Sequence, residues 1–173
     1  PTDTLPALAA TPENASQLWK LKERPLTKPL ILMGASLNEL LKHIDSIALE
    51  DALEMGMRYW PGALTVVLPS KQGIVDFLNP GASTIGLRIP DSKPAKDLLR
   101  ISGPLATTSA NLSGQEASKT ALEAAKNFPG IPLLSPLPWP TFSGIASTVI
   151  CWESKKNWRV LRNGAVMPEN LEN

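Results

Sequence analysis

The spacing of hydrophobic residues along this chain changes between a helical and an extended period, and these changes predict its elements. A cap residue, a proline and an acid at Thr11-Pro12-Glu13 predict a helix over residues 11–23. Apolar residues at helical spacing predict a helix over residues 48–58, and we expect further helices over residues 94–101 and 118–127. A capping-box pattern from Ser36 to Glu39 predicts a further short helix. Short apolar runs predict strands over residues 29–33, 63–68, 84–89, 103–106, 131–134, 147–152 and 158–162. Several strands follow one another without an intervening helix, so we expect an α/β fold with a twisted, mixed sheet.

Length and charge narrow the class of protein. The 173 residues suit a single domain, and 17 Lys and Arg against 16 Asp and Glu give a net charge of +1. This balance offers no general argument for nucleic-acid, membrane or acidic partners, so any basic site is local. The chain has no signal-peptide pattern and no apolar run near the roughly 20 residues of a membrane helix, so we expect a cytoplasmic protein without membrane contact.

Several kinds of catalysis are disfavoured by composition. His43 and Cys151 are the only residues of their types, which argues against cysteine–histidine catalysis, a histidine–cysteine metal site and an intrachain disulfide. We expect no protein-only metal site. Neither a G-x-S-x-G nucleophile elbow nor a G-x-x-x-x-G-K-[ST] phosphate loop is present. A bound nucleotide would therefore be held in another way.

A row of short polar side chains follows the apolar run at 103–106. If this stretch stays extended, Thr107, Ser109 and Asn111 alternate onto one face, because side-chain direction repeats every second residue. Hydroxyl and amide groups in such a row can line one wall of a site for a polar ligand. The same residues also favour helix caps and turns, so the row alone leaves both interpretations open.

Cations near proline and in apolar strands give a second set of candidates. Lys22 and Arg24 are two residues apart before Pro25, and extension there would point both side chains the same way, forming an anion clamp that Lys28 closes. A solvated basic helix end is the alternative. Arg88 and Arg162 stand alone in apolar strands, where each must reach solvent or an anion.

Taken together, these positions resemble the YrdC/Sua5 family of threonylcarbamoyl-AMP synthases. The resemblance extends over nearly the whole chain, through seven motifs in the family's order: Pro1-Thr2-Asp3-Thr4, Lys22-x-Arg24-Pro25-x-x-Lys28-Pro29-Leu30, Trp60-Pro61-Gly62-Ala63-Leu64-Thr65, Leu87-Arg88-Ile89-Pro90, Thr108-Ser109-Ala110-Asn111-x-Ser113-Gly114, Ser147-Thr148-Val149 and Leu161-Arg162-x-Gly164. Each motif alone is weak, whereas seven in order are highly specific.

The resemblance implies a YrdC-like twisted open sheet with a large, concave, positively charged cavity. It also implies a nucleotidyltransferase reaction, in which L-threonine, bicarbonate and ATP with Mg²⁺ give threonylcarbamoyl-adenylate and pyrophosphate. Partner proteins would then transfer the threonylcarbamoyl group to adenosine 37 of tRNA. By motif, Lys22, Arg24, Ser109 and Asn111 match the family's catalytic set around the nucleotide phosphates.

The remaining site residues implied by the resemblance divide into two groups. ATP-side positions, besides Arg24 and Ser109, are Lys28, Thr84 and Arg162, and the positions that hold threonine are Thr4, Arg88, Thr107 and Ser147. The chain departs from the family at Leu5-Pro6-Ala7, where the family has Val-Tyr-Gly, and the shape of the threonine pocket depends on that segment.

Domain boundaries and other functions complete the expectations. The family has a helix and strand before its Pro-Thr-Asp-Thr motif, with which this sequence opens, and we expect no second Sua5-type domain after Arg162. We therefore expect one YrdC-like domain over residues 1–173. The alternatives are a paralogue that is inactive or uses another substrate, a module for double-stranded or structured RNA (tRNA included), and a carbamoyl-transfer role like that of the YrdC-like domain in hydrogenase maturation proteins. Near-zero net charge weakens the RNA interpretation.

Overall fold

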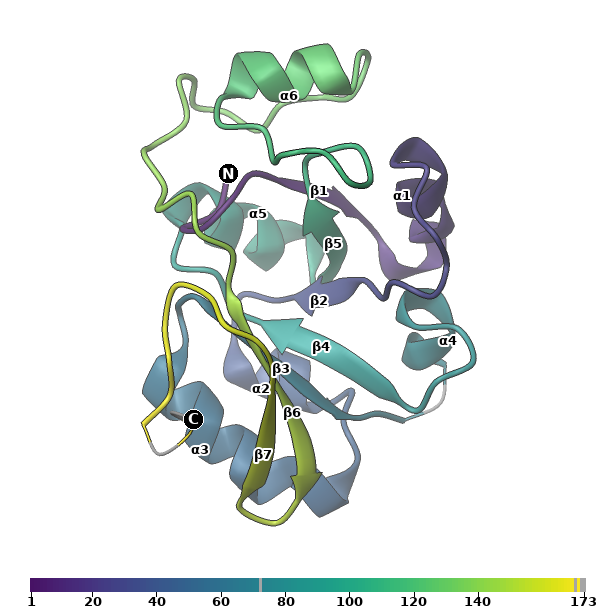
Figure 1. Ribbon diagram of the computed structural model, residues 1–173, viewed down its shortest axis with the longest axis vertical. Helices are drawn as coiled ribbons and strands as arrows, with labels where there is room; N and C mark the ends of the chain where they lie inside the picture. Colours follow the sequence, from purple (N-terminus) through teal and green to yellow (C-terminus); the bar gives the residue numbers. More distant parts are fainter. Residues whose placement is uncertain (72, 170, 172–173) are drawn as a thin grey trace.

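A seven-stranded mixed sheet runs through the computed structural model, which describes residues 1–71, 73–169 and 171 (Figure 1). Its strands are β1 Ala7–Ala10, β2 Ile31–Met33, β3 Leu64–Pro69, β4 Thr84–Arg88, β5 Leu105–Ser109, β6 Thr148–Ser154 and β7 Asn157–Arg162. Their order is β1-β5-β2-β4-β3-β6-β7. The β2–β4 and β3–β6 pairs are parallel and the other neighbours antiparallel, which confirms the predicted mixed, open sheet.

Short helices connect and cover these strands (Figure 1). Their bounds are α1 Ser16–Leu21, α2 Leu37–Leu41, α3 Leu49–Tyr59, α4 Ile74–Leu78, α5 Lys93–Ser102 and α6 Ala121–Asn127, with 3-10 turns at Pro12–Asn14 and Ser46–Ala48. The predicted cap at α2 is confirmed, because the Ser36 hydroxyl accepts from the Glu39 amide. None of the described helices has the length and apolarity that crossing a bilayer requires.

Two hydrophobic clusters hold the sheet in place. The larger one contains the inward side chains of the central strands, such as Leu32, Val66 and Leu87, each at most 1% exposed. The smaller one joins Met33 and Leu105 to Leu99 of α5. Each buried side chain of this size contributes about 1.5–3 kcal/mol to folding, so the packing fixes where the strand ends lie.

Several segments differ from the predicted elements, among them α4, for which no helix was predicted. Residues 7–10 form β1, which was not predicted, because its alanines carry little strand preference and the strand exists through its antiparallel pairing with β5. The strand predicted over residues 131–134 is wrong: the segment is irregular, and Pro132 has no N–H with which to join a ladder. It lines an apolar cavity instead, together with Phe128 and Leu99.

The end of the first helix also differs. Helix α1 ends at Leu21, and Lys22 caps it in helical conformation, while Glu23 has a φ of 50°. Lys22 and Glu23 form a turn, and Glu23 lies in the left-handed region, so the expected extension from Lys22 to Arg24 is wrong. The two side chains take their directions from tertiary contacts rather than from a two-residue repeat.

Candidate active site

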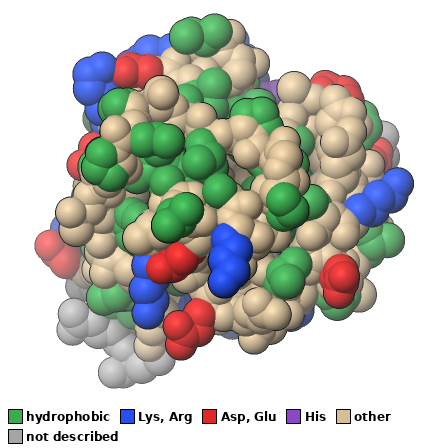
Figure 2. Space-filling model, turned by 90° about the horizontal axis from the view of Figure 1, so that it is seen from above, with side chains coloured by type: hydrophobic (Ala, Val, Ile, Leu, Met, Phe, Trp, Pro, Cys, Tyr) green, Lys and Arg blue, Asp and Glu red, His purple; other side chains and the backbone are tan. Residues whose placement is uncertain are grey.

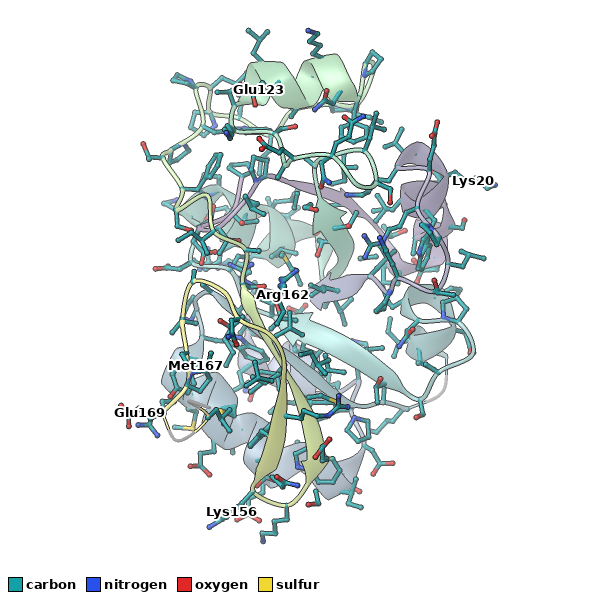
Figure 3. All side chains as sticks on the ribbon, in the orientation of Figure 1. Lys20, Glu123, Lys156, Arg162, Met167 and Glu169 are labelled. Carbon is teal, nitrogen blue, oxygen red and sulfur yellow. The ribbon has the colours of Figure 1, made fainter. Side chains whose placement is uncertain are left out.

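A cavity of about 150 Å³ lies where the ends of several strands meet. Polar side chains from segments far apart in the sequence line it: Thr2, Thr4, Arg24, Arg88, Thr107, Thr108, Ser109, Ser147 and Arg162. Among the described residues that line it, none is Asp or Glu. Arg162 lies near the middle of the molecule, whereas Lys20, Lys156 and Glu169 lie at its periphery (Figure 3). Three arginines thus meet around one small hollow.

Two further cavities adjoin this one. A cavity of about 330 Å³, mostly apolar, shares Thr107 and Met33 with it, and a cavity of about 720 Å³ shares Leu5 and Ala146. The expected large concave space therefore consists of neighbouring compartments. Its overall positive charge remains a prediction.

Arg88, at the end of β4, is 3% exposed and makes three hydrogen bonds with the protein. Its Nε donates to the Gly62 carbonyl at 2.9 Å, Nη1 to the Thr4 hydroxyl at 2.9 Å and Nη2 to the Asp3 carboxylate at 2.7 Å. Burial lowers the pKa of Arg88, and the nearby negative charge of Asp3 opposes this effect. The anion predicted for Arg88 is thus already present in the chain as Asp3, a residue that was not predicted to belong to the site.

Lys22 is 1% exposed, and its ammonium group has a different environment. The Nζ donates to the Ser109 carbonyl, and to the Asn111 side-chain oxygen at 3.1 Å. The Ser109 hydroxyl in turn donates to that oxygen at 2.5 Å. Burial, followed by the charges of Arg24 and Lys28, lowers the pKa of Lys22 to about 8. The structure therefore brings together the predicted set of Lys22, Ser109 and Asn111.

The predicted common face of Thr107, Ser109 and Asn111 is only partly formed. Strand β5 ends at Ser109, so Asn111 lies beyond the strand and reaches Ser109 by turning back. Its amide nitrogen donates to the Leu112 and Gln115 carbonyls, which fixes this turn. The polar-wall interpretation therefore holds for Thr107 and Ser109 on β5, and the turn interpretation holds for Asn111.

Of the residues predicted for the nucleotide side, Arg24, Ser109 and Arg162 line the cavity, whereas Lys22, Asn111, Lys28 and Thr84 do not. The Arg24 guanidinium donates to the Lys28 and Pro29 carbonyls at 3.2 and 3.0 Å, and burial lowers its pKa. Lys28 is exposed, and its charge reaches Lys22 only through space. Thr84 begins β4 at the end opposite to Arg88, since the strand runs between these two residues. Its ATP-side role remains a prediction that the cavity does not support.

Three hydroxyls predicted for the threonine side lie at the cavity. Thr107 donates to the Ile31 carbonyl at 3.0 Å, which leaves its oxygen as an acceptor. Thr4 accepts from Arg88 and contacts the Thr2 hydroxyl at 3.1 Å.

Ser147 is contacted by Arg162, whose guanidinium donates to the Ser147 carbonyl at 2.8 Å and to its hydroxyl at 3.2 Å. The site thus offers donors from arginine beside hydroxyl acceptors.

Comparison with known proteins assigns the chain to a family. The profile named Sua5_yciO_yrdC, described as "Telomere recombination", matches residues 1–164. The chain belongs to this family. The resemblance inferred from its seven motifs is thereby confirmed.

Individual members of the Sua5/YciO/YrdC family are similar over much of the chain. A threonylcarbamoyl-AMP synthase of Idiomarina loihiensis is 38% identical over 74% of this chain and 72% of its own length. A threonylcarbamoyl-AMP synthase of Bacillus subtilis is 35% identical over 99% of this chain but 51% of its own length. The structure of P. abyssi Sua5 complexed with L-threonine is 31% identical with a TM-score of 0.85, covering 95% of this chain and 49% of that one. This chain therefore spans about half the length of the latter two relatives.

Proposed function

We propose that this protein is an enzyme of the transferase type, a threonylcarbamoyl-AMP synthase. It joins L-threonine, bicarbonate and ATP into threonylcarbamoyl-adenylate with release of pyrophosphate, as a nucleotidyltransferase. The observation that carries the proposal is the meeting of Arg24, Arg88 and Arg162 with hydroxyl groups around one cavity that no described carboxylate lines. The similarity to threonylcarbamoyl-AMP synthases and to a threonine-bound Sua5 supports it.

The proposed chemistry asks the protein mainly to align two anions. Threonine and bicarbonate condense to a carbamate with loss of water, and a carbamate oxygen then attacks the α-phosphorus of ATP while pyrophosphate leaves. Fixed cations lower this barrier by holding the reactants and by stabilising charge on the phosphate oxygens. Arg24 and Lys22 suit the phosphates, since both are cations without a carboxylate among their hydrogen-bond partners.

The threonine side would lie at the other end of the same cavity. The Thr4 and Thr107 oxygens can accept from an ammonium or carbamate N–H, and Arg162 and Ser147 lie where a carboxylate can bind. Arg88 has a smaller role than the resemblance implied, because Asp3 already occupies its Nη2. A carboxylate would share this guanidinium with Asp3 rather than neutralise it alone.

Magnesium would enter with the nucleotide. No group of three or more His, Cys, Asp or Glu side chains suited to a metal lies within the described residues. Mg²⁺ commonly keeps several waters and binds through substrate phosphates, which fits a cavity with hydroxyl rather than carboxylate oxygens.

The test is pyrophosphate release from ATP, measured with and without L-threonine and bicarbonate. We expect release only with both. Arg24→Ala removes charged hydrogen bonds worth about 1.5–3 kcal/mol, so the rate should fall by roughly tenfold to more than a hundredfold. Arg100→Ala is the matched control, because Arg100 is exposed on α5 and pairs with Asp97. Release without threonine, or an unchanged Arg24→Ala rate, would contradict the proposal.

Measuring RNA binding beside pyrophosphate release separates the enzyme from the RNA-binding alternative. On the face seen from the α6 end, Lys and Arg are interspersed with Asp and Glu rather than gathered into one basic area (Figure 2). Salt-sensitive RNA binding without pyrophosphate release would replace the enzyme proposal by that alternative.

After synthesis, the product would pass to transfer proteins that modify tRNA.

A further inference from the structure

Thr65, on the inner strand β3, contacts Ser147, a residue of the cavity wall. Its side chain is 1% exposed, and its Oγ1 is 2.9 Å from the Ser147 Oγ. A Cβ added at Gly86 on the neighbouring strand β4 would lie 3.3 Å from the Thr65 methyl group, so the methyl packs against that glycine. This packing keeps the hydroxyl turned toward Ser147, which itself lines the cavity.

The direction of the Thr65–Ser147 hydrogen bond follows from counting donors and acceptors. Within the described part of the chain, Thr65 Oγ1 has Ser147 Oγ as its single hydrogen-bond partner. A buried hydroxyl that does not donate loses the hydrogen bond it made with water, at a cost that natural proteins usually avoid. Thr65 must therefore donate to Ser147.

Ser147 Oγ then has no acceptor capacity left. A hydroxyl oxygen accepts two hydrogen bonds and donates one. The two that it accepts come from Thr65 and from the Arg162 Nη2 at 3.2 Å. The Ser147 proton still needs an acceptor. Among the described residues only the Thr65 oxygen is near enough, and the proton of Thr65 already lies between these two oxygens. The proton therefore points into the cavity.

We infer that Thr65 is a positioning residue, which makes Ser147 an obligate hydrogen-bond donor toward a ligand oxygen in the cavity. The choice of ligand rests on the proposed function: the acceptor is a carboxylate or carbamate oxygen of the threonine substrate. Thr107 has the opposite polarity, because its proton is used on the Ile31 carbonyl. Ser147 and Arg162 thus form a donor wall, and Thr107 belongs to an acceptor wall. Fixed polarity of this kind favours one orientation of a zwitterion.

Neutron diffraction from a deuterium-exchanged crystal tests the hydrogen-bond direction without any ligand. We expect the Thr65 deuterium to point at Ser147 Oγ and the Ser147 deuterium to point into the cavity. A Ser147 deuterium directed at Thr65 Oγ1 would overturn the inference. This measurement holds even if the proposed function fails.

Calorimetric titration with L-threonine tests the consequence for binding. Thr65→Val should weaken threonine binding about threefold to tenfold, the effect of one neutral hydrogen bond. Thr65→Ser should restore it, and ATP affinity should be unchanged in both. Ser70→Ala is the matched control, because its hydroxyl donates to the His43 carbonyl just beyond the far end of β3. Normal threonine binding by Thr65→Val would overturn the inference.

A double-mutant cycle separates positioning from general damage. In a Ser147→Ala background, Thr65→Val should cost little more, because the group that it orients is already gone. An undiminished effect of Thr65→Val in that background would show that Thr65 does not act through Ser147. A wild-type protein that binds no threonine would instead refute the proposed function, while neutron diffraction would still decide the role of Thr65.

Discussion

Arg88 and Lys22 are both buried cations, yet their hydrogen-bond partners differ. Arg88 forms an ion pair with Asp3 at 2.7 Å, with side chains 3% and 18% exposed. Lys22 is equally buried but is held by a carbonyl, a hydroxyl and an amide oxygen, without a carboxylate. One charge is neutralised within the chain, and the other is not. We conclude that Arg88 is neutralised within the fold, whereas no carboxylate among the described residues contacts Lys22.

The difference implies different consequences for stability and binding. A buried ion pair costs much when one member is lost, because the other member remains charged and desolvated. A buried cation without a counter-ion is less stable in its charged form, which is the origin of the lowered pKa of Lys22. Arg88 should therefore matter more for folding and Lys22 more for binding an anion.

Removal of the Asp3 charge should have the largest effect. Asp3→Asn leaves Arg88 without a counter-charge, so the free energy of unfolding should fall by about 3 kcal/mol, toward the lower end for a broken buried pair. Urea unfolding measures this change. Asp97→Asn is the control, because Asp97 pairs with Lys93 and Arg100 on the surface, and its loss should change stability little. A loss for Asp3→Asn below about 1 kcal/mol would make the pair no stronger than a surface one.

Lys22→Met should have the opposite effect, with a large loss of ATP affinity and little loss of stability. The substitution removes a cation that has no carboxylate partner, so ATP should bind roughly tenfold to a hundredfold more weakly, as for the loss of a charged hydrogen bond. The protein should stay folded, because methionine fills similar space and removes the buried charge. Calorimetric titration with ATP and urea unfolding provide the two readouts. Lys20→Met, on the exposed part of α1, is the control. Unchanged ATP affinity would remove Lys22 from the site.

The pH dependence of stability and of ATP affinity should distinguish Lys22 further from Arg88. Lys22 has a pKa of about 8 in the folded protein and 10.5 ordinarily, so the unfolded chain binds more protons between these values. Stability should therefore rise with pH from about 8 to 10.5, while ATP affinity falls as Lys22 loses its charge. Unfolding and titration at about pH 7 and about pH 10 measure both trends. Lys22→Met should lose this rise in stability, and an equal rise in that variant would assign it to another group.

Much of the fold could be predicted because it is encoded locally. The apolar runs around Val66, Leu87 and Ile150 reach the core as expected, and the Ser36 cap begins α2. The errors come from segments whose structure depends on distant partners. Strand β1 is held by β5, and α4 has only five residues, too few for a helical repeat to stand out.

The site residues likewise divide into those that a local pattern indicates and those that depend on distant partners. Residue types and order indicated Lys22, Ser109 and Arg162, since cations and hydroxyls at strand ends already suggest an anion site. Asp3 and Thr65 were missed, although both lie in recognised motifs, because their roles depend on contacts with Arg88 and Ser147 that are 85 and 82 residues away in the sequence. No local pattern indicates which buried hydroxyl or carboxylate will orient which ligand group.

The smallest effect should come from Lys28, which acts on Lys22 only through its charge. Lys28→Gln removes the last of three causes that lower the pKa of Lys22, after burial and Arg24. That pKa should rise slightly, so the loss of ATP affinity at high pH should move to slightly higher pH. Because Lys28 is exposed, about 1 M salt, with its Debye length of about 3 Å, should abolish the difference from wild type. A shift that persists in high salt would mean that Lys28 acts through the structure of the segment rather than through its charge.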